Sequence, residues 1–556
     1  MHRIVSFLKK YGFCNGIIGV LRFLCSTTIM RIAARILDFM PENYFRCHAN
    51  NKKINLYEGN IEADAKRILS GEKKLLFYNP IDPNIAEDIK YKWEDERLHD
   101  IYILAQADNA EARKKYEMIL DDYNVVTIHP DDIAMEVSIR AINIIESAKF
   151  YKGNINEKNV VTKFLKSALI YILRNPERGV IYSGNHYFFN LLGILWILEN
   201  IEGNWIINGL HRFSKKRLIV LLKQIILKDG ALYENSTHYH KYVTESYLLY
   251  LASTGKKTNK VMLSFAEKMW SFCEFMATEG KIIGIGDNDS GRILPLPNYY
   301  QYSSVDITVI RKLAKQLNLK KIIGNGDEFG IFVLQNRTWK CYLRCDLVRD
   351  AKKNRTIGNH AHNDQLSVYL WYCNIPVFID RGTYMYILKE DIRKNNMLTK
   401  HHNTVSIGRY EQNKLPEGFT YFERTAKGTI IEKTTTSMTA EITGYYEHIH
   451  KRKISVIESG IEIIDTIENA GNQSQSSEIH FCIAPIWKVQ QISANICMLK
   501  CDNNSIIMKS QNPISIREGE VFPEYGEIVK VKCVDIELAS VGVNHVQICE
   551  QLEETL

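Results

Sequence analysis

The hydrophobic periodicity of this chain changes once along its length, and that change limits the fold more than any other feature. Between about residues 84 and 280, apolar residues recur three and four positions apart, as on one face of an α-helix. From about residue 327 onward, short alternating or apolar runs are separated by turn residues, which is typical of β-strands. A chain of 556 residues that is 45% hydrophobic can bury two or three cores. The sequence therefore predicts a helical domain followed by a β domain.

The helical half begins with one continuous predicted helix over residues 86–105. The next follows Asp131 and Asp132, whose negative charges suit a helix N-terminus. The apolar periods predict helices over residues 133–151, 157–174, 186–202, 212–228, 238–254 and 258–278. Helices of this length joined by short loops favour an array or toroid of helical hairpins, although periodicity alone does not close a ring.

The β half is predicted to be an antiparallel sandwich, because its strands are short, often alternating and closely spaced. Residues 366–372 and 375–379 are predicted to form a hairpin with a tight turn at Cys373 and Asn374. Further strands are expected over residues 329–334, 338–343, 428–431, 453–457 and 460–465. We place an N-terminal amphipathic docking segment at residues 1–75, an (α/α) toroid with its connection (285–327) at 76–326, and the sandwich at 327–556.

A histidine-rich stretch, Asn359-His360-Ala361-His362-Asn363-Asp364, precedes the predicted hairpin. Side chains alternate along a strand, so His360, His362 and Asp364 would share one face. The hairpin would hold them and Asp380 at one end of a sheet, and His402 could join from a later segment. Two imidazoles and a carboxylate are a normal zinc set, but histidines satisfied inside a core are more common. Spacing alone leaves both interpretations open.

Charge and cysteine content narrow the partners and the compartment. The net charge of +7 is small for 556 residues, and no basic stripe has the spacing of a nucleic-acid motif. We therefore expect no nucleic-acid partner, whereas an anionic glycan or small molecule fits. Twelve scattered cysteines without a Cys-x-x-Cys pair favour buried free thiols and a reducing, cytoplasmic location.

The N-terminal segment is compatible with two roles. Residues 11–21 resemble a short signal-peptide apolar region, which would make the protein periplasmic or secreted, but Arg22 interrupts the run. Arg22, Arg31 and Arg35 interleave with apolar residues, as in an amphipathic helix that docks on the protein or on a membrane surface. No run of about 18 uncharged apolar residues exists, so we expect no spanning helix. Peripheral membrane contact through residues 1–40 stays open, as does the oligomeric state.

Two polar insertions interrupt the helical half, and core packing does not require their side chains. The first is Ser183-Gly184-Asn185-His186 and the second spans residues 229–242. Each insertion taken alone is explained equally well by helix capping, with Asn185 and Ser236 as the caps.

Together these motifs resemble the heparinase II/III-like family of polysaccharide lyases, including its alginate lyase relatives. The resemblance covers most of the chain from about Trp93, and its motifs keep one order along the sequence. They are Met135-Glu136 with Arg140 and Asn143, Asn185-His186, Asp229-Gly230 with Glu234, Ser236, Tyr239 and His240, Gly286-Asp287-Asn288-Asp289, His360-x-His362-x-Asp364, Asp380-x-Gly382-Thr383 and His402-Asn403-Thr404. The family's (α/α) toroid followed by an antiparallel β-sandwich agrees with the periodicity.

The resemblance implies a lyase that cleaves a uronate-containing acidic polysaccharide or oligosaccharide by β-elimination. The C5 proton is removed and the C4–O bond breaks, leaving an unsaturated uronate. Donors aimed at the carboxylate would stabilise the developing charge. Tyr239 would be the general acid, and also the base in a syn elimination, whereas His186 or His360 would be the base in an anti elimination. The catalytic residues implied are Asn185, His186, Tyr239 and His360.

The resemblance also divides the histidine-rich stretch, because it makes His360 catalytic and assigns a zinc ion to the later histidine. The implied zinc ligands are His362, Asp380 and His402, in a structural role, with His401 as the alternative if the local register differs. Substrate contacts are expected from Arg140, Asn143, Glu234, His240, Tyr384 and Tyr386. The chain departs from the family over residues 393–400, which lack the arginine expected near Thr399.

Two other functions would use overlapping features. A C5 uronate epimerase would remove the same proton and return it from the other face. A non-catalytic glycan-binding protein of a polysaccharide assembly system would need affinity alone, and the combined presence of Asn185, His186, Tyr239 and His360 argues against it. A zinc hydrolase is not favoured, because the sequence has no His-Glu-x-x-His helix.

Overall fold

Not every residue of the chain is described by the computed structural model. Side chains and backbone are described for residues 24–48, 53–54, 56–57, 59–72, 88–122, 126–156, 159–179, 183–254, 259–296, 300, 303–346, 360–385, 391–416, 425–444, 446, 448–468, 476–538 and 542–551, and residues 13–23, 157 and 390 are described as backbone alone.

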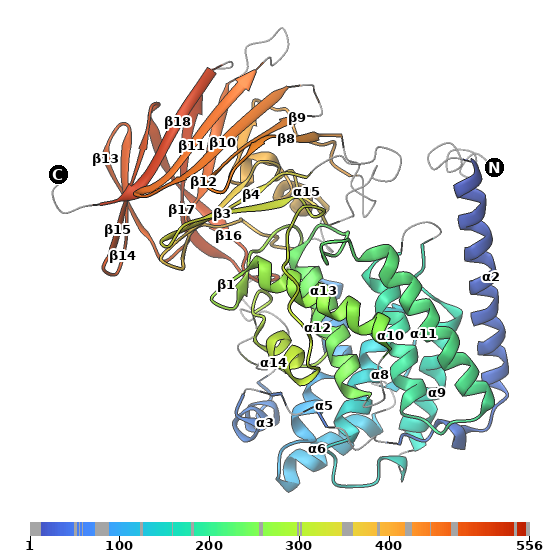
Figure 1. Cartoon of the computed structure of the whole chain (residues 1–556). Coiled ribbons are helices and arrows are strands. Elements are labelled where there is room, and N and C mark those ends of the chain that lie inside the picture. The colour runs from blue at the N-terminus through green and yellow to red at the C-terminus, as the bar shows by residue number, and fades with distance from the viewer. Residues whose placement is uncertain are drawn as a thin grey trace.

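Helices occupy the first part of the described chain and strands the second (Figure 1). The helices are α2 Phe13–Asp38, η1 Glu42–Phe45, α3 Ile61–Leu69, α4 Ile89–Glu96, α5 His99–Leu104, α6 Ala110–Asp121, α8 Ala134–Ala148, η2 Ile155–Glu157, α9 Asn159–Arg174, α10 Asn185–Glu199, α11 Trp205–Ile225, α12 Thr237–Ser253, α13 Lys260–Met276 and α14 Thr308–Gln316. A short hairpin, β1 Ala277–Thr278 and β2 Lys281–Ile282, follows α13. From residue 133 onward, every predicted helix is present.

The single helix predicted over residues 86–105 is wrong, because the chain breaks between α4 and α5. Leu98 has a φ of 60°, in the left-handed region that an α-helix cannot include. The break accompanies a buried ion pair, in which Arg97 Nε donates to Glu136 Oε2 of α8 at 2.6 Å. The predicted connection over 285–327 also contains an unpredicted helix, α14, whose apolar face is buried.

The core of the helical domain is formed by helices that are buried on almost every side. Every residue of α8 and of α12 is buried. The N-terminal helix α2 lies along α9 at the edge of the domain (Figure 1). Its buried face includes Met30, Ala34 and Leu37, and Lys166 of α9 donates to the backbone carbonyls that end α2 and follow it. Within the described residues, none of the helices combines the length and apolar character needed to cross a bilayer.

The β domain contains three antiparallel sheets around a second core. Their orders are β13-β14-β15-β18-β11-β10-β9-β8, β16-β17-β12-β7 and β3-β4-β5-β6. The strands are β3 Ile331–Gln335, β4 Trp339–Arg344, β5 Val368–Tyr372, β6 Ile375–Phe378, β7 Val405–Ile407, β8 Lys427–Lys433, β9 Ser437–Thr443, β10 Ile449–Ile457, β11 Gly460–Glu468, β12 Ser477–Cys482, β13 Lys488–Ser493, β14 Ile496–Cys501, β15 Asn504–Ser510, β16 Ile514–Val521, β17 Val529–Leu538 and β18 Gly542–Glu550, with α15 Glu390–Asn396 and η3 Thr399–His401 between β6 and β7.

The predicted hairpin is confirmed as β5 and β6. Its turn residues Cys373 and Asn374 have φ angles of 48° and 64°, which is the geometry of a tight hairpin turn. The expectation of a strand over the histidine-rich stretch is wrong, because residues 360–367 form an irregular segment before β5. Strand alternation therefore does not apply there, and Asp364 lies beside Arg344, with Nε and Oδ1 3.6 Å apart, instead of joining the histidines.

The loop between β16 and β17 connects the two domains. Tyr525 Oη donates to Asp88 Oδ2 at 2.6 Å, and Asn288 donates to the carbonyl oxygen of Pro523 at 3.0 Å. Glu524 is buried and accepts from Ser290 Oγ at 2.6 Å and from the backbone N–H of Ser304 at 2.7 Å. Burial raises the pKa of Glu524 to about 7 despite these two donors. The two domains therefore share a buried polar contact.

Candidate active site and metal centre

The N-terminus of α10 carries two of the predicted catalytic residues. Gly184 is the N-cap, so the interpretation of Asn185 as a cap is wrong. Glu234 accepts from the backbone N–H of Asn185 at 3.2 Å and from its Nδ2 at 2.9 Å, which satisfies the helix end and fixes the amide. A Cβ at Gly184 would lie 2.3 Å from Glu234 Oε1, so a larger residue there would displace this carboxylate from Asn185.

His186 is the accessible member of the pair, with a side chain that is 47% exposed. Its Nδ1 lies 2.6 Å from Glu177 Oε1. Desolvation of the ring opposes its charge, but Glu177 outweighs this effect and raises the pKa of His186. His186 is therefore biased towards the imidazolium form, which suits it to bind a carboxylate.

Tyr239 and His360 bring the two domains into contact. Their rings are stacked with centroids 3.8 Å apart and an interplanar angle of 16°. Tyr239 lies in the first turn of α12, where Ser236 accepts from its backbone N–H at 3.2 Å, so the predicted capping role of Ser236 is confirmed. The segments meet at Gly286, whose φ is 76° and where a Cβ would lie 2.4 Å from the carbonyl oxygen of His360. The close contact excludes any larger residue there.

Asp287 is the charged centre of this contact, and it is fully buried. Its Oδ2 accepts from His360 Nδ1 at 3.1 Å and from Arg393 Nη2 at 3.0 Å, while its Oδ1 accepts from His362 Nε2 at 3.0 Å. Burial opposes ionisation, but Arg393 and the two imidazoles lower the pKa of Asp287 well below its ordinary range. Because an ionised carboxylate only accepts, His360 carries a proton on Nδ1 and presents Nε2 as its second functional nitrogen.

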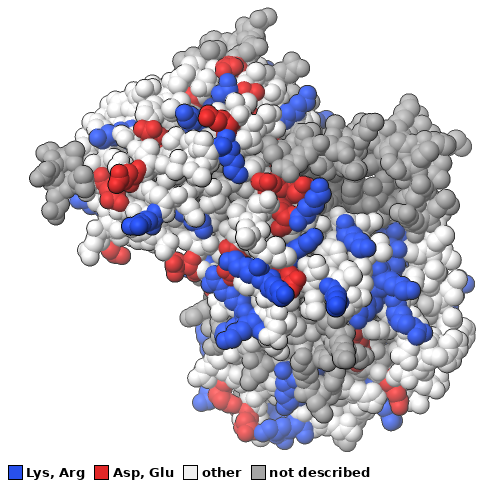
Figure 2. All heavy atoms as spheres, viewed as in Figure 1, with Lys and Arg blue, Asp and Glu red and all other residues white. Residues whose placement is uncertain are grey.

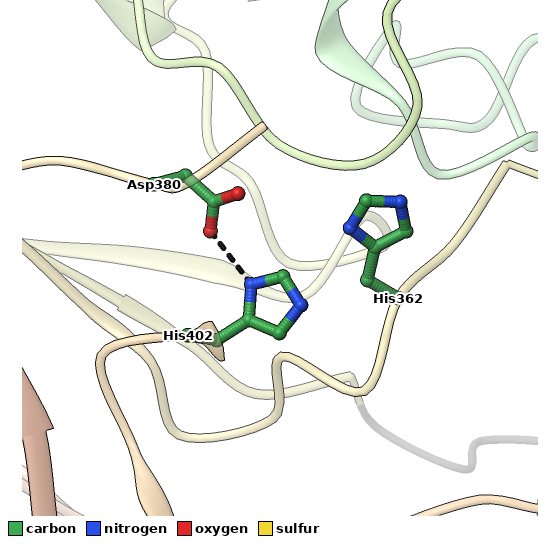
Figure 3. A group of neighbouring side chains, drawn as sticks. All are labelled: His362, Asp380 and His402. Atoms are coloured by element: carbon green, nitrogen blue, oxygen red, sulfur yellow. Dashed lines mark hydrogen bonds and ion pairs between the residues drawn. The ribbon is translucent and has the colours of Figure 1, made fainter. Parts of the chain in front are cut away.

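Three buried side chains beside this centre could hold a metal ion (Figure 3). His362 precedes β5, Asp380 follows β6, and His402 follows η3. One ligand atom from each lies within 4.8 Å of the others. His402 Nδ1 donates to Asp380 Oδ2 at 2.9 Å. The structure thus brings together the three residues that the resemblance assigned to zinc.

The donor set fits a divalent metal such as zinc. His362 Nδ1 and His402 Nε2 are buried and have no hydrogen-bond partner among the described atoms, although buried ring nitrogens normally have one. Two imidazoles and a carboxylate are a common zinc set. The other nitrogen of His362 is bonded to Asp287, which matches the carboxylate that usually lies behind a metal-binding histidine.

His401, the alternative ligand, points elsewhere. Its Nδ1 accepts from Arg381 Nη1 at 2.6 Å. Burial and the positive charge of Arg381 lower the pKa of His401 to about 2. The geometry therefore favours His402 as the ligand.

The remaining predicted substrate contacts are engaged within the protein. Arg140 is buried and donates to the carbonyl oxygens of Glu96 and Thr127, both at 2.9 Å. Asn143 Nδ2 donates to the carbonyl oxygen of Ile293 at 2.8 Å, and His240 Nδ1 accepts from the backbone N–H of Leu232 at 3.2 Å. Their substrate contacts stay predictions.

Tyr384 is partly exposed, and its ring packs on Phe522 with centroids 5.3 Å apart. Tyr386 lies outside the described residues. Glu234 contributes by positioning Asn185, as described above.

Three site residues were not predicted, namely Asp287, Glu177 and Arg393. Asp287 belongs to the motif Gly286-Asp287-Asn288-Asp289, which contributed to the resemblance, so the sequence could have identified it as a site residue. Glu177 and Arg393 gave no signal, because their partners are chosen by tertiary contacts.

Solved structures share this arrangement of a helical domain followed by an antiparallel β-sandwich. Heparinase III is 14% identical to this chain, and the two superpose with a TM-score of 0.67. The alignment covers 96% of this chain and 92% of heparinase III. Heparan sulfate lyase HepC from Pedobacter heparinus is 13% identical, with a TM-score of 0.55. The alignment covers 95% of this chain and 89% of HepC. At these identities the likeness establishes the fold, and it confirms the predicted architecture. Closure of the helical array into a ring stays a prediction.

A sequence comparison identifies the C-terminal domain. Residues 320–548 match the family model described as "Heparinase II/III-like, C-terminal". The chain therefore carries a heparinase II/III-like C-terminal domain, as its motifs predicted. No curated protein sequence matches the chain.

Proposed function

We propose that this protein is a polysaccharide lyase, a carbon–oxygen lyase that cleaves an acidic glycan by β-elimination at a uronic acid. The observation that carries the proposal is the Tyr239–His360 stack between the two domains, with His360 held by the buried carboxylate of Asp287. A phenol and an oriented imidazole are the groups that proton transfer requires, and a binding protein has no need of them. The shared fold with a heparan sulfate lyase supports a glycosaminoglycan or a related uronate polymer as substrate.

The chemical difficulty is the weak acidity of the C5 proton beside a carboxylate. His186 is partly exposed and biased towards its cation, so we assign it to the substrate carboxylate, where it stabilises the charge that develops. Asn185 is assigned to the same group, because its Nδ2 carries a second hydrogen beyond the one given to Glu234. Lysine and arginine side chains are also frequent over the helical half of the face in Figure 2, which favours an anionic polymer.

Tyr239 is assigned as the acid that protonates the leaving O4 oxygen. The C5 proton goes to whichever of the stacked groups lies on its side of the sugar ring. In a syn elimination that group is the Tyr239 phenolate, and in an anti elimination it is His360 Nε2. The same pair could return the proton to C5, which is why a C5 epimerase is the competing reaction.

The residues His362, Asp380 and His402 would hold zinc, which would supply a rigid structural link rather than chemistry. Their own contribution is to fix the segment before β5, and with it His360. Asp287 connects the two roles, because it bonds both His360 and His362.

We also propose that α2 binds peripherally to an anionic membrane surface. Leu24, Ile29, Ile32, Ile36 and Phe39 are exposed, between 43% and 91%, and most of them follow the three- and four-residue spacing of one helix face. The exposed Arg31 and Arg35 flank that face, which suits anionic headgroups. Binding to vesicles containing phosphatidylglycerol, but not to phosphatidylcholine vesicles, is expected, and Ile32→Asp should abolish it. Unchanged binding by this variant would refute the proposal.

A cytoplasmic location is proposed on a separate ground. The cysteines with described side chains are all free, which suits a reducing compartment.

The lyase proposal is tested with the purified chain and a panel of uronate-containing glycans. We expect ultraviolet absorbance from an unsaturated uronate, and products lighter by one water than hydrolysis products. Tyr239→Phe should lower kcat by about 100-fold or more. Tyr247→Phe is the matched control, because it removes a buried phenol of the same helix that bonds the carbonyl oxygen of Met262 instead. Solvent deuterium at C5 without chain cleavage would select the epimerase, and turnover unchanged in Tyr239→Phe would refute the assignment.

A further inference from the structure

The sheet β16-β17-β12-β7 borders a pocket that the proposed elimination does not use. Its volume is about 630 Å³, and all its lining residues come from the β domain. The wall includes Arg381, Lys400, Arg517 and Lys530, together with the two cysteines Cys482 and Cys533. A basic pocket with two thiols in its wall is an unusual combination, so we asked what chemistry it permits.

The charge of the pocket is net positive. Arg517 pairs with Asp535. Among the described residues, no carboxylate lies within ion-pair distance of Arg381, Lys400 or Lys530. Glu518 and Glu520 also line the pocket, but Glu518 is already paired with Lys532. The pocket therefore suits an anionic ligand.

The two cysteines lie directly opposite each other on neighbouring strands. Cys482 of β12 is the register partner of Cys533 of β17. The next pair bonds through its backbone, because the N–H of Ile483 donates to the carbonyl oxygen of Lys532 at 3.1 Å. Hydrogen-bonded and non-hydrogen-bonded pairs alternate in an antiparallel ladder, so the cysteines occupy a non-hydrogen-bonded position. Their Cα atoms are then about 4.5 Å apart, inside the range of about 4.4–6.8 Å that a disulfide spans.

The environment also prepares one thiol for reaction. The neighbouring Cys482 thiol lowers the pKa of Cys533 against the effect of burial, and the Arg517 guanidinium lowers it further. Both residues are more than nine-tenths buried, yet both border the pocket, which gives a small reagent a route to them.

We propose that Cys482 and Cys533 form a redox-modifiable dithiol that reacts with an anionic low-molecular-weight disulfide bound in the basic pocket. The Cys533 thiolate attacks one sulfur of the reagent, which forms a mixed disulfide and releases one reagent thiolate. The Cys482 thiol then loses its proton and attacks the Cys533 sulfur, which forms the protein disulfide and releases the second reagent thiol. Two protein thiols are oxidised and one reagent disulfide is reduced to two thiols, so the reaction balances without any other oxidant.

The position of the pair gives the modification a consequence. The N–H of Cys482 donates to Asn403 Oδ1 at 2.7 Å, and its carbonyl oxygen accepts from the N–H of Ile379 at 3.1 Å. Asn403 and Ile379 adjoin His402 and Asp380 in the sequence. A cross-strand disulfide at a non-hydrogen-bonded position is strained, so it would strain the backbone that carries these two side chains.

The other cysteines offer an internal control. Cys497 and Cys501 are buried on one strand, β14, four positions apart. Residues so placed are about 13 Å apart along a strand, which no disulfide spans. The same reasoning applies to Cys341 on β4 and Cys345, which directly follows this strand.

The test uses the full-length reduced protein with glutathione disulfide as the probe, followed by non-reducing peptide mass spectrometry and counting of free thiols. At this pair we expect loss of two thiols, release of two glutathione molecules, and one link between the peptides of Cys482 and Cys533, whereas the exposed Cys25 and Cys373 would each retain one glutathione. Cys482→Ser should instead retain one glutathione on Cys533, and Cys497→Ser should behave as the wild-type protein. Retention of both thiols, or equal oxidation of Cys497, would overturn the proposal.

The charge of the pocket is tested with a neutral reagent, 2-hydroxyethyl disulfide, each rate being normalised to that with free cysteine. Glutathione disulfide should react about tenfold faster or more at low salt. The exposed lysines allow a mild variant, Lys400→Gln with Lys530→Gln, in which most of this advantage should disappear, as it should in 1 M salt. Equal normalised rates for the two reagents with the wild-type protein would refute the role of the basic pocket.

Discussion

The Asp287→Asn substitution tests whether one buried carboxylate supports both His360, the proposed catalytic histidine, and the candidate metal triad. Asparagine keeps the shape of the side chain but has one carbonyl oxygen, so it cannot accept from His360, His362 and Arg393 together. The buried Arg393 loses its carboxylate, and loss of one partner of a buried ion pair costs about 3–5 kcal/mol of the free energy of unfolding.

The functional loss can be estimated from the same contacts. His360 loses the acceptor that orients its ring, and a misplacement of about 1 Å costs about 100-fold in rate. His362 loses the carboxylate behind it, which lowers metal affinity by about 10–100-fold. We therefore expect the zinc Kd to rise by that factor, and kcat to stay about 100-fold low even when excess zinc restores occupancy.

Asp289→Asn is the matched control for this experiment. Asp289 is buried two positions along the chain, but it pairs with Lys90, with Oδ2 and Nζ 3.3 Å apart. It should lose stability while keeping its zinc affinity and turnover within a few-fold of the wild-type protein. Zinc affinity is measured by competition with a chromophoric chelator, and turnover from the unsaturated product, at a temperature where thermal melts show each variant folded. Wild-type kcat and zinc affinity in Asp287→Asn would refute the coupling.

Three further predictions concern separate contacts. Asp380→Ala should abolish zinc retention after dialysis, whereas His401→Ala should leave it intact, because the ring of His401 bonds Arg381. Glu524→Gln should change the pH dependence of stability: the pKa of Glu524 is raised from 4.5 to about 7 in the folded state, so its contribution is present below pH 4.5 and is lost as pH rises through 7. The contribution that Glu524 loses amounts to about 3 kcal/mol of the free energy of unfolding. The Tm of the variant should therefore rise relative to that of the wild-type protein between pH 5 and 8. Glu177→Gln should lower the pKa of His186 and raise KM more than kcat falls, most strongly near pH 7.

Each of these predictions has a clear contrary result. Zinc loss from His401→Ala with retention in Asp380→Ala would reverse the ligand assignment. A Tm difference between Glu524→Gln and the wild-type protein that stays constant with pH would show that Glu524 does not titrate in this range. If Glu177→Gln lowers kcat and leaves KM unchanged, His186 acts in proton transfer and not in carboxylate binding.

The parts predicted well from the sequence are those fixed by local pattern. The helices from α8 onward follow the apolar period, and the β5–β6 turn follows from Cys373-Asn374 between two apolar runs. The break at Leu98 could not be predicted from the sequence, because leucine rarely adopts a positive φ and tertiary contacts impose it here.

The polar partners of the site were beyond the reach of local pattern for a different reason. Arg393 reaches Asp287 across 106 positions of the chain, and Glu234 reaches Asn185 across 49. Nothing near a carboxylate in the sequence specifies which distant cation or amide it meets. The division of the histidines into two groups came from the family resemblance alone, since the strand alternation expected of them is absent.

The loop between β16 and β17 has a consequence for how the molecule is made. Tyr525 bonds Asp88 across 437 positions of the chain, and Glu524 bonds Ser304 across 220. At synthesis rates of about 5–20 residues per second, the ribosome needs about 20–90 seconds to bring Tyr525 to Asp88. During that interval the polar groups that this loop will cover stay in water or in contact with a chaperone. A nascent chain stopped at the end of β16 therefore has its helices, but Asp88, Asn288 and Ser290 still lack the partners that this loop supplies.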